Sequence, residues 1–173
     1  MSTSLVLTVI GIDRPGLIQA VAATVAQCGG NWLESRMCRL GGQFAGIVHV
    51  SVSEEAHPNL VEKLGLLQEK GLTITVFADV NDFESPTGLS ARLEIIGNDQ
   101  PGIIRQITEI LNEHQVNVEE LQSEVLSAPM AGGLIFQAKT KIRLPASCHV
   151  HDLRKKLEAL AADLQVDISF EED

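Results

Sequence analysis

The sequence contains one turn motif twice, and this repeat constrains the fold more than any other feature. Ile10–Ile18 reads IGIDRPGLI, and Ile96–Ile104, 86 positions later, reads IGNDQPGII. The same shift aligns Asn31 with Asn117. A repeat at a fixed spacing indicates one supersecondary unit used twice. The best-matched stretch is a turn rather than a core segment, and turns carry ligand chemistry more often than packing.

Length and composition agree with two small domains. The chain has 173 residues, of which 45% are hydrophobic and 21% are charged, which is ordinary for a globular protein. We predict a first domain over 1–80, a linker over 81–88 that is rich in turn residues, and a second domain over 89–173. Halves of this size bury little core, so we expect each to pack against the other or against a second chain.

Hydrophobic periodicity predicts the order β-α-β-β-α-β in each half. The first helix follows Pro15 and carries Leu17, Val21 and Val25 at helical spacing before Gly29 ends it. In the first half, strands are expected at 5–10, 31–39, 44–52 and 72–78, and a second helix at 57–70. In the second half, strands are expected at 93–96, 116–125, 134–142 and 166–170, and helices at 103–111 and 150–164. This order predicts an α+β fold of two ferredoxin-like units, each an antiparallel four-stranded sheet with both helices on one face.

Charge and cysteine content exclude several classes of function. The formal net charge is −10, which disfavours direct nucleic-acid binding and anionic membranes. No apolar stretch reaches the length of a membrane helix, and the start of the chain lacks a signal-peptide pattern. Three cysteines without C-x-x-C spacing are typical of reduced thiols. The chain is expected to be cytoplasmic.

The D-x-P-G turn is the strongest chemical signal. Asp13 and Asp99 are expected to cap N–H groups at the start of the first helix of each half. The proline two residues after each aspartate fixes φ at the entry to that helix. Gly16 and Gly102 lack a Cβ, so a ligand can approach the backbone, and free helix N–H groups suit a carboxylate.

The aligned asparagines, Asn31 and Asn117, offer a donor and an acceptor to an amino acid, and we expect them beside the turn. The alternative interpretation is that each Asp is only a cap and each Asn only a helix-exit residue.

Two β-α-β-β-α-β units that open with D-x-P-G and continue to an Asn resemble tandem ACT domains, which bind amino acids in many enzymes and regulators. The resemblance covers Leu5 to Phe170. A stand-alone pair of this size also resembles the glycine cleavage system transcriptional repressor family of bacteria. That resemblance implies a regulator that contacts a DNA-binding protein.

The resemblance also assigns site residues. Serine-binding ACT domains read H-x-N-x-P-G, and their His, first Asn and later Asn hold the ligand. Here Asp13 and Asp99 replace the first Asn, Asn31 and Asn117 match the later Asn, and glycines stand where the His would be, at Gly11 and Gly97. We therefore predict ligand binding by Asp13, Arg14, Gly16, Asn31, Asp99, Gly102 and Asn117. Arg14 adds a cation where the second half has Gln100, so we expect the first site to bind more tightly.

Other chemistry is less well supported. The run from Cys148 to Asp152 contains metal-ligating residue types, but its spacing matches no compact zinc pattern. His49 is interpreted as a structural histidine. No nucleotide-binding or nucleophile motif is present, and an RNA-binding sheet would need aromatic and basic residues. We predict no catalytic residue, no metal and no cofactor.

The leading hypothesis is a non-enzymatic regulatory protein that senses a small amino acid, glycine being the first candidate. It would act on transcription through a protein partner, as a homodimer. The first alternative is an ACT adaptor that serves assembly without a ligand. The second is a small enzyme, against which no paired acid, base or nucleophile is placed at a turn.

Overall fold

The computed structural model describes residues 2–79, 87–127 and 133–172. The chain divides into two compact units, Met1–Asp82 (unit 1) and Phe83–Asp173 (unit 2). Each unit is described by itself. The predicted linker 81–88 and the predicted hairpin turn 128–133 fall largely outside the described residues.

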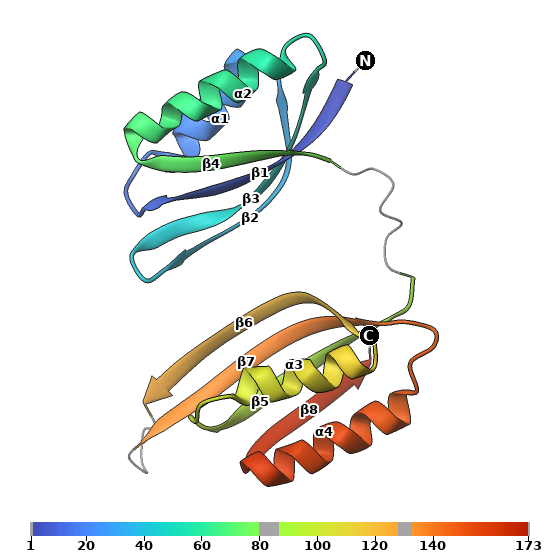
Figure 1. Ribbon diagram of the computed structural model, residues 1–173. Helices are drawn as coiled ribbons and strands as arrows, with labels where there is room; N and C mark the ends of the chain where they lie inside the picture. Colours follow the sequence, from blue (N-terminus) through green and yellow to red (C-terminus); the bar gives the residue numbers. More distant parts are fainter. Residues whose placement is uncertain (1, 80–86, 128–132, 173) are drawn as a thin grey trace. The chain divides into compact units, whose positions relative to one another are not determined.

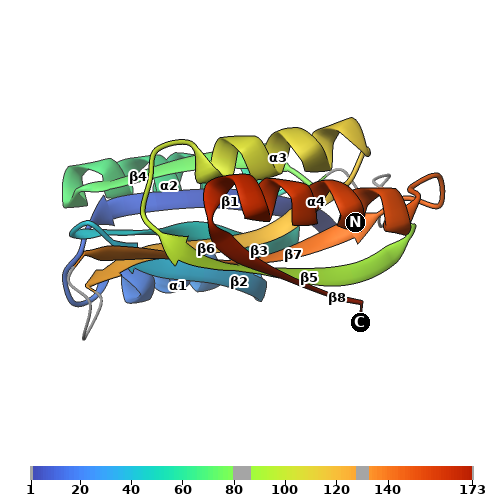
Figure 2. The same ribbon diagram turned by 90° about the horizontal axis from the view of Figure 1, so that it is seen from below.

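Unit 1 has the predicted β-α-β-β-α-β order. Its elements are β1 (Ser2–Ile12), α1 (Leu17–Gln27), β2 (Asn31–Leu40), β3 (Gln43–Ser53), α2 (His57–Leu66), the 3-10 helix η1 (Leu67–Lys70) and β4 (Leu72–Ala78). The strands form one sheet in the order β2-β3-β1-β4, and every neighbouring pair is antiparallel. Figures 1 and 2 show both helices on one face of this sheet.

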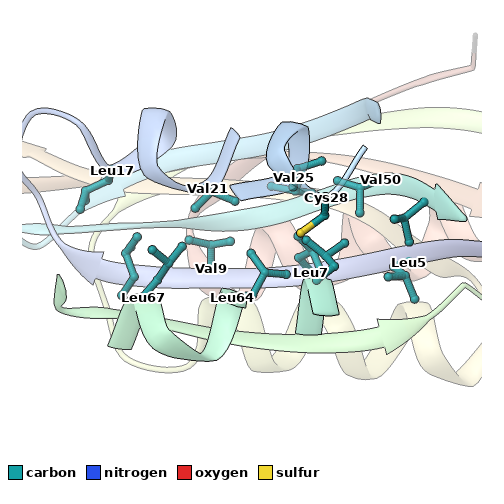
Figure 3. Close-up of a cluster of buried hydrophobic side chains, with 14 residues drawn as sticks. Leu5, Leu7, Val9, Leu17, Val21, Val25, Cys28, Val50, Leu64 and Leu67 are labelled. Carbon is teal, nitrogen blue, oxygen red and sulfur yellow. The ribbon is translucent and has the colours of Figure 1, made fainter. Parts of the chain in front are cut away.

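Alternation along β1 explains the core of unit 1. Leu5, Leu7 and Val9 are at most 2% exposed, because they point to the face that α1 and α2 cover. The apolar stripe of α1 meets them, as Figure 3 shows for Leu17 and Val21 among others. The second helix is shorter than predicted: α2 ends at Leu66, and one turn of 3-10 helix continues to the left-handed Gly71.

Unit 2 repeats the architecture. Its elements are β5 (Leu89–Asn98), α3 (Ile103–Glu113), β6 (Asn117–Ser127), β7 (Leu134–Leu144), α4 (Val150–Leu164) and β8 (Val166–Glu172). The strand order is β6-β7-β5-β8, again fully antiparallel. A separate core forms from residues such as Leu93, Ile107 and Leu157. The predicted α+β fold of two ferredoxin-like units is therefore confirmed.

Two details were not predicted. β1 and β5 extend well beyond the expected spans, because polar residues on their open faces do not interrupt the sheet. Both edge strands β2 and β6 also contain an irregularity near their start, between Trp32 and Glu34 and between Val118 and Glu120. Such a bulge adds one unpaired residue and changes which side chains face outward. Within the described segments, no helix has the length and apolar character that crossing a bilayer requires.

Candidate functional site

The repeated motif forms the same turn in both units. It connects β1 to α1 in unit 1 and β5 to α3 in unit 2, and Gly16 and Gly102 are the N-cap residues of the two helices. Each helix therefore begins at the residue that follows the glycine, Leu17 or Ile103. No side chain caps either helix start in the described residues. First-turn N–H groups left without a side-chain partner are suitable donors for an anion.

Backbone conformation explains the glycines. The φ angles are +92° at Gly16 and +96° at Gly102, in the left-handed region that side chains with a Cβ rarely adopt. A Cβ at Gly16 would meet nothing within 4 Å, and one at Gly102 would lie 3.7 Å from Gln106 Nε2. The space in front of both turns is open, so crowding by the protein itself does not require glycine there.

The two aspartates do not cap the helices, so that expectation was wrong. The Asp13 carboxylate instead lies 2.6 Å from Arg39 Nε, at the end of β2. The backbone N–H of Asp13 donates to the Gly42 carbonyl at 3.0 Å, and that of Asp99 donates to the Leu134 carbonyl at 2.9 Å. These bonds fix each turn to the neighbouring hairpin and leave the side chain directed elsewhere. In unit 2 the position aligned with Arg39 is Val125, so that position carries no cation for Asp99.

Arg14 and Gln100 share a structural contact. A guanidinium nitrogen of Arg14 donates to the Lys70 carbonyl, at the end of η1. In unit 2 the amide of Gln100 donates to the Leu164 carbonyl at 2.5 Å, at the end of α4. Each side chain thus satisfies a carbonyl at the end of the second helix of its unit, where helices leave acceptors unpaired. This shared contact accounts for the presence of Arg14 and Gln100 at these positions without any ligand. The spacing of residues in the sequence did not predict it.

Steric crowding at Gly11 and Gly97 excludes the histidine that the serine-binding motif has at this position. A Cβ at Gly11 would lie 2.7 Å from the Gly71 carbonyl oxygen, and one at Gly97 would lie 2.5 Å from Val166 Cγ1. Both distances are shorter than side chains tolerate, because the following strand, β4 or β8, begins directly beside the glycine. A histidine therefore cannot replace either glycine without a shift of the sheet.

The structure does not bring Asn31 to the turn of its own unit. Asn31 pairs with Ser51 of β3, and Ser51 pairs with Ser4 on the other side. Asp13 lies nine residues beyond Ser4 along the chain, which is about 30 Å at the rise of a strand. In unit 2, Asn117 and Ser90 both pair with Arg143, so Asn117 is equally far from Asp99. The expectation that each Asn lies beside its own turn was wrong.

A polar cluster in unit 1 escaped the sequence analysis. Ser4 Oγ lies 2.5 Å from His49 Nε2, and the same nitrogen lies 3.1 Å from Asp79 Oδ2. A nucleophilic triad needs the serine and the carboxylate on different ring nitrogens. The cluster therefore does not match that geometry, and it connects β1, β3 and the end of β4. Cross-strand register could have predicted the Ser4–His49 contact.

The segment around Cys148 lines a hollow of about 290 Å³ at the end of α3. His114 Nδ1 lies 2.9 Å from the Ile110 carbonyl, and burial raises the pKa of the Cys148 thiol. In the described part of the chain no three His, Cys, Asp or Glu side chains are placed to hold one metal ion. A raised pKa disfavours the thiolate, so this hollow is poorly suited to nucleophilic chemistry.

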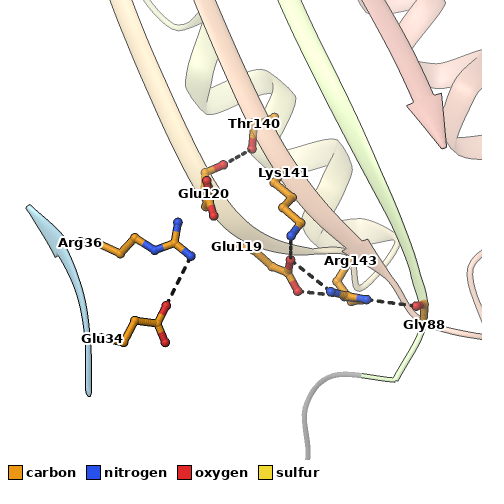
Figure 4. Close-up of polar contacts among 8 residues, drawn as sticks. All are labelled: Glu34, Arg36, Gly88, Glu119, Glu120, Thr140, Lys141 and Arg143. Atoms are coloured by element: carbon orange, nitrogen blue, oxygen red, sulfur yellow. Dashed lines mark hydrogen bonds and ion pairs between the residues drawn. The ribbon is translucent and has the colours of Figure 1, made fainter. Parts of the chain in front are cut away.

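The bulge of β6 organises an ion cluster in unit 2, shown in Figure 4. Arg143 Nε donates to Glu119 Oε1 at 2.8 Å and Nη2 to Oε2 at 3.3 Å, while Lys141 Nζ lies 3.7 Å from Glu119. The hydrogen bond from Arg143 lowers the pKa of the Glu119 carboxyl. Arg143 also donates to the Gly88 carbonyl at 3.4 Å. The cluster therefore holds Gly88, just before β5, against β7.

Comparison with known proteins decides the family. The ACT domain family model matches residues 3–77 and again residues 93–171. The chain belongs to the ACT domain family. It contains two copies of the domain, and each copy includes one D-x-P-G turn.

Two relatives cover nearly the whole chain. The glycine cleavage system transcriptional repressor of Escherichia coli is 27% identical over 161 residues, which is 92% of this chain and 85% of the repressor. The repressor of Shigella flexneri matches to the same extent. The crystal structure of an unknown protein from Galdieria sulphuraria is 28% identical and has a TM-score of 0.85, covering 100% of this chain and 99% of that one. The match to the Galdieria structure therefore extends over nearly the full length of both chains.

Proposed function

We propose that this ACT-domain chain is a non-enzymatic regulatory protein that binds a small amino acid and acts on transcription through a protein partner. Its membership of the ACT family and its similarity to a glycine cleavage system transcriptional repressor support this function. Glycine is the first candidate ligand. The proposal includes the expected cytoplasmic location and requires neither a cofactor nor direct contact with nucleic acid.

The observation that carries the proposal is the uncapped helix start beside an aspartate in both domains. In unit 1 this start adjoins the Asp13–Arg39 ion pair, whose side chains are 35% and 71% exposed. An amino acid is a zwitterion, so its ammonium complements Asp13 and its carboxylate complements Arg39 and the helix N–H groups. Unit 2 has Val125 at the position aligned with Arg39, so we expect the tighter site in unit 1. This agrees with the preference predicted from sequence, but Arg39 replaces Arg14 as its cause.

Asn31 and Asn117 can act at a turn only if that turn belongs to a different unit. Each Asn is about 30 Å along the sheet from the turn of its own unit. A ligand at the turn of one unit can meet an asparagine only if a different unit supplies it. The proposed homodimer would bring an asparagine of one chain to the turn of the other. Binding by Asp13, Gly16 and Arg39 does not depend on it.

The test is calorimetric titration of the purified chain with each of the twenty amino acids. We expect saturable binding of a small amino acid. Asp13→Ala and Arg39→Ala should each weaken it about tenfold, since each removes a charged hydrogen bond. Arg105→Ala, which removes an exposed ion pair with Glu109 on α3, is the matched control and should leave affinity unchanged.

The outcome also separates the alternative functions. If none of the twenty amino acids binds while the chain is folded and dimeric, the result would favour the ACT adaptor that assembles without a ligand. Binding that survives both unit 1 variants and is lost in Asp99→Ala would reverse the assignment of the tighter site.

A further inference from the structure

The outer edge of β4 has none of the features that keep other strands away. β4 ends the strand order β2-β3-β1-β4, so among the described strands it pairs with β1 alone, as Figure 1 shows. Its sequence, LTITVFA, contains no charged residue, no proline and no glycine. Natural edge strands usually carry such residues, because free N–H and C=O groups along an edge can pair with another strand. The edge of β4 is therefore suited to strand addition.

Half of the backbone groups of β4 point away from β1. The N–H of Asp79, the residue after β4, donates to the Ser4 carbonyl at 2.9 Å. In an antiparallel pair such bonds recur at every second residue. Thr73, Thr75 and Phe77 therefore bond to β1. The residues between and beside them direct N–H and C=O groups to the open edge: Leu72, Ile74, Val76 and Ala78.

β4 is complementary to a second copy of itself. When two β4 strands run antiparallel with Thr75 opposite Thr75, Ile74 of each copy lies opposite Val76 of the other. The outward N–H and C=O groups of these two residues then form ladder bonds. Threonine pairs and pairs of β-branched side chains stabilise a sheet. This register therefore satisfies the open backbone groups and the side chains together.

The corresponding edge of unit 2 lacks this complementarity. β4 pairs with β1 from Gly11, and β8 pairs with β5 from the aligned Gly97, so the two edge strands correspond. Where β4 has Thr73, Phe77 and Ala78, β8 has Asp167, Glu171 and Glu172. The same register centred on Ser169 would place Asp167 opposite Glu171, and like charges opposite one another destabilise a sheet. Self-pairing is thus favoured at β4 and disfavoured at β8.

Opposite charges meet at both ends of the β4 pairing. The register places Gly71 of one copy opposite Asp79 of the other. A guanidinium nitrogen of Arg14 donates to the Lys70 carbonyl and lies 4.0 Å from the position of a Cβ at Gly71. Arg14 and Lys70 therefore bring cations towards the Asp79 carboxylate of the second copy. This attraction offsets part of the repulsion between chains with a net charge of −10.

We infer that the β4 edge of unit 1 binds the β4 edge of a second copy of the chain, antiparallel and centred on Thr75, so that two sheets join into one. β2 lies at the opposite edge of the sheet, so this contact leaves β2 accessible. A chain with a further two-fold contact elsewhere would form assemblies larger than a dimer. The inference does not depend on the proposed amino-acid site.

Charge substitution at the centre of the pairing tests the contact. Thr75→Lys places two ammonium groups opposite one another and should raise the dissociation constant of the assembly about tenfold, measured by sedimentation equilibrium. Ser169→Lys makes the same charge change at the corresponding position of β8 and should leave it within about twofold. Both side chains are exposed, so both variants should keep the melting temperature of the parent chain.

Disulfide cross-linking tests the register. In a Cys38→Ser background, which removes the exposed native thiol, Thr75→Cys places two cysteines in a pair whose Cα atoms are about 4.5 Å apart. This separation allows a disulfide. Two cysteines introduced by Thr73→Cys would be about 13 Å apart along the strands. With oxidised glutathione, we expect cross-linked dimers on non-reducing gels from Thr75→Cys and not from Thr73→Cys.

Three outcomes would overturn the inference. The first is a parent chain whose mass equals that of Thr75→Lys at every concentration, as would occur if a segment of another protein takes this edge. The second is an equal loss of assembly in both lysine variants, which would indicate an effect of net charge. The third is cross-linking of Thr73→Cys as fast as that of Thr75→Cys. Amino-acid binding measured by calorimetry should be unchanged in Thr75→Lys, so either proposal can fail without the other.

Discussion

Gly16 allows the ligand site to be tested without confusing binding with folding. A leucine there would force a β-carbon into the left-handed region and destabilise the fold by about 1–2 kcal/mol. Asparagine tolerates that region better than other side chains, and in Gly16→Asn its amide would stand over the helix start. We expect Gly16→Asn to abolish amino-acid binding measured by calorimetry. Gly29→Asn, at the other end of α1 with φ +70° and equally open space, should keep it. Equal affinities in the two variants would remove the turn as a ligand site.

Gly97 should be intolerant of even a methyl group. A Cβ there would lie 2.5 Å from Val166 Cγ1 and 2.8 Å from Val166 Cα, so Gly97→Ala should destabilise unit 2 by about 1–3 kcal/mol. Gly65→Ala is the control, because that glycine lies in α2 with nothing within 4 Å of its Cβ. It should stabilise unit 1 by about 0.5–1 kcal/mol. Urea unfolding measures both changes, and a neutral Gly97→Ala would contradict the steric reason for the missing histidine.

At this scale the sequence predicted residue types better than residue roles. The glycines of both turns were predicted from the access they give a ligand, whereas the structure explains them by their left-handed conformation; their contact with a ligand stays a prediction. Arg14 and Asp13 were assigned to a ligand or a cap, but their partners, Lys70 and Arg39, come from other elements. Asn31 was placed beside the turn because the motif is close in sequence, although α1 carries the chain back to the other end of the sheet. Contacts of this kind depend on register, which residue type does not reveal.

The bulge of β6 should make unit 2 sensitive to acid. The folded pKa of Glu119 is below its ordinary value of 4.5, because Arg143 donates hydrogen bonds to the carboxylate. The stabilisation is therefore complete above the unfolded pKa, and it is lost as the pH falls through the lower folded value. We expect Glu119→Gln to reduce the acid dependence of the melting temperature of unit 2. If the melting temperature of this variant depends on pH as in the parent chain, the ionisation of Glu119 does not contribute to the stability of unit 2.

The sequence predicted the existence and order of the elements, because period-2 and helical patterns are strong here. Leu60, Leu64 and Leu67 lie at helical spacing and are buried, although the helix tightens to 3-10 geometry before Gly71. The bulges at Leu33 and Glu119 could not be predicted, since they follow from how β2 and β6 pair with their neighbours.

The whole molecule should unfold in two steps. Each unit has its own core, with Leu64 at 1% exposure in unit 1 and Leu157 at 2% in unit 2. Truncation of either leucine to alanine should cost about 2–5 kcal/mol. Hydrogen exchange followed by mass spectrometry should show faster exchange only in the unit that carries the substitution. Acceleration in both units would mean that they unfold as one, and would count against the proposed boundary over 81–88.

The first and last strands of each unit pair with each other, so the chain enters and leaves the unit at neighbouring positions. Leu5 pairs with Ala78, and the Asp79 N–H donates to the Ser4 carbonyl at 2.9 Å. In unit 2, Ala91 likewise pairs with Glu172. Because entry and exit of the chain are neighbours, a gene segment for one unit can be copied in frame, or spliced into a surface loop of an unrelated protein, without breaking a strand. The fold is therefore a natural cassette, and the 86-residue shift between Ile10 and Ile96 has the form that one such duplication would leave.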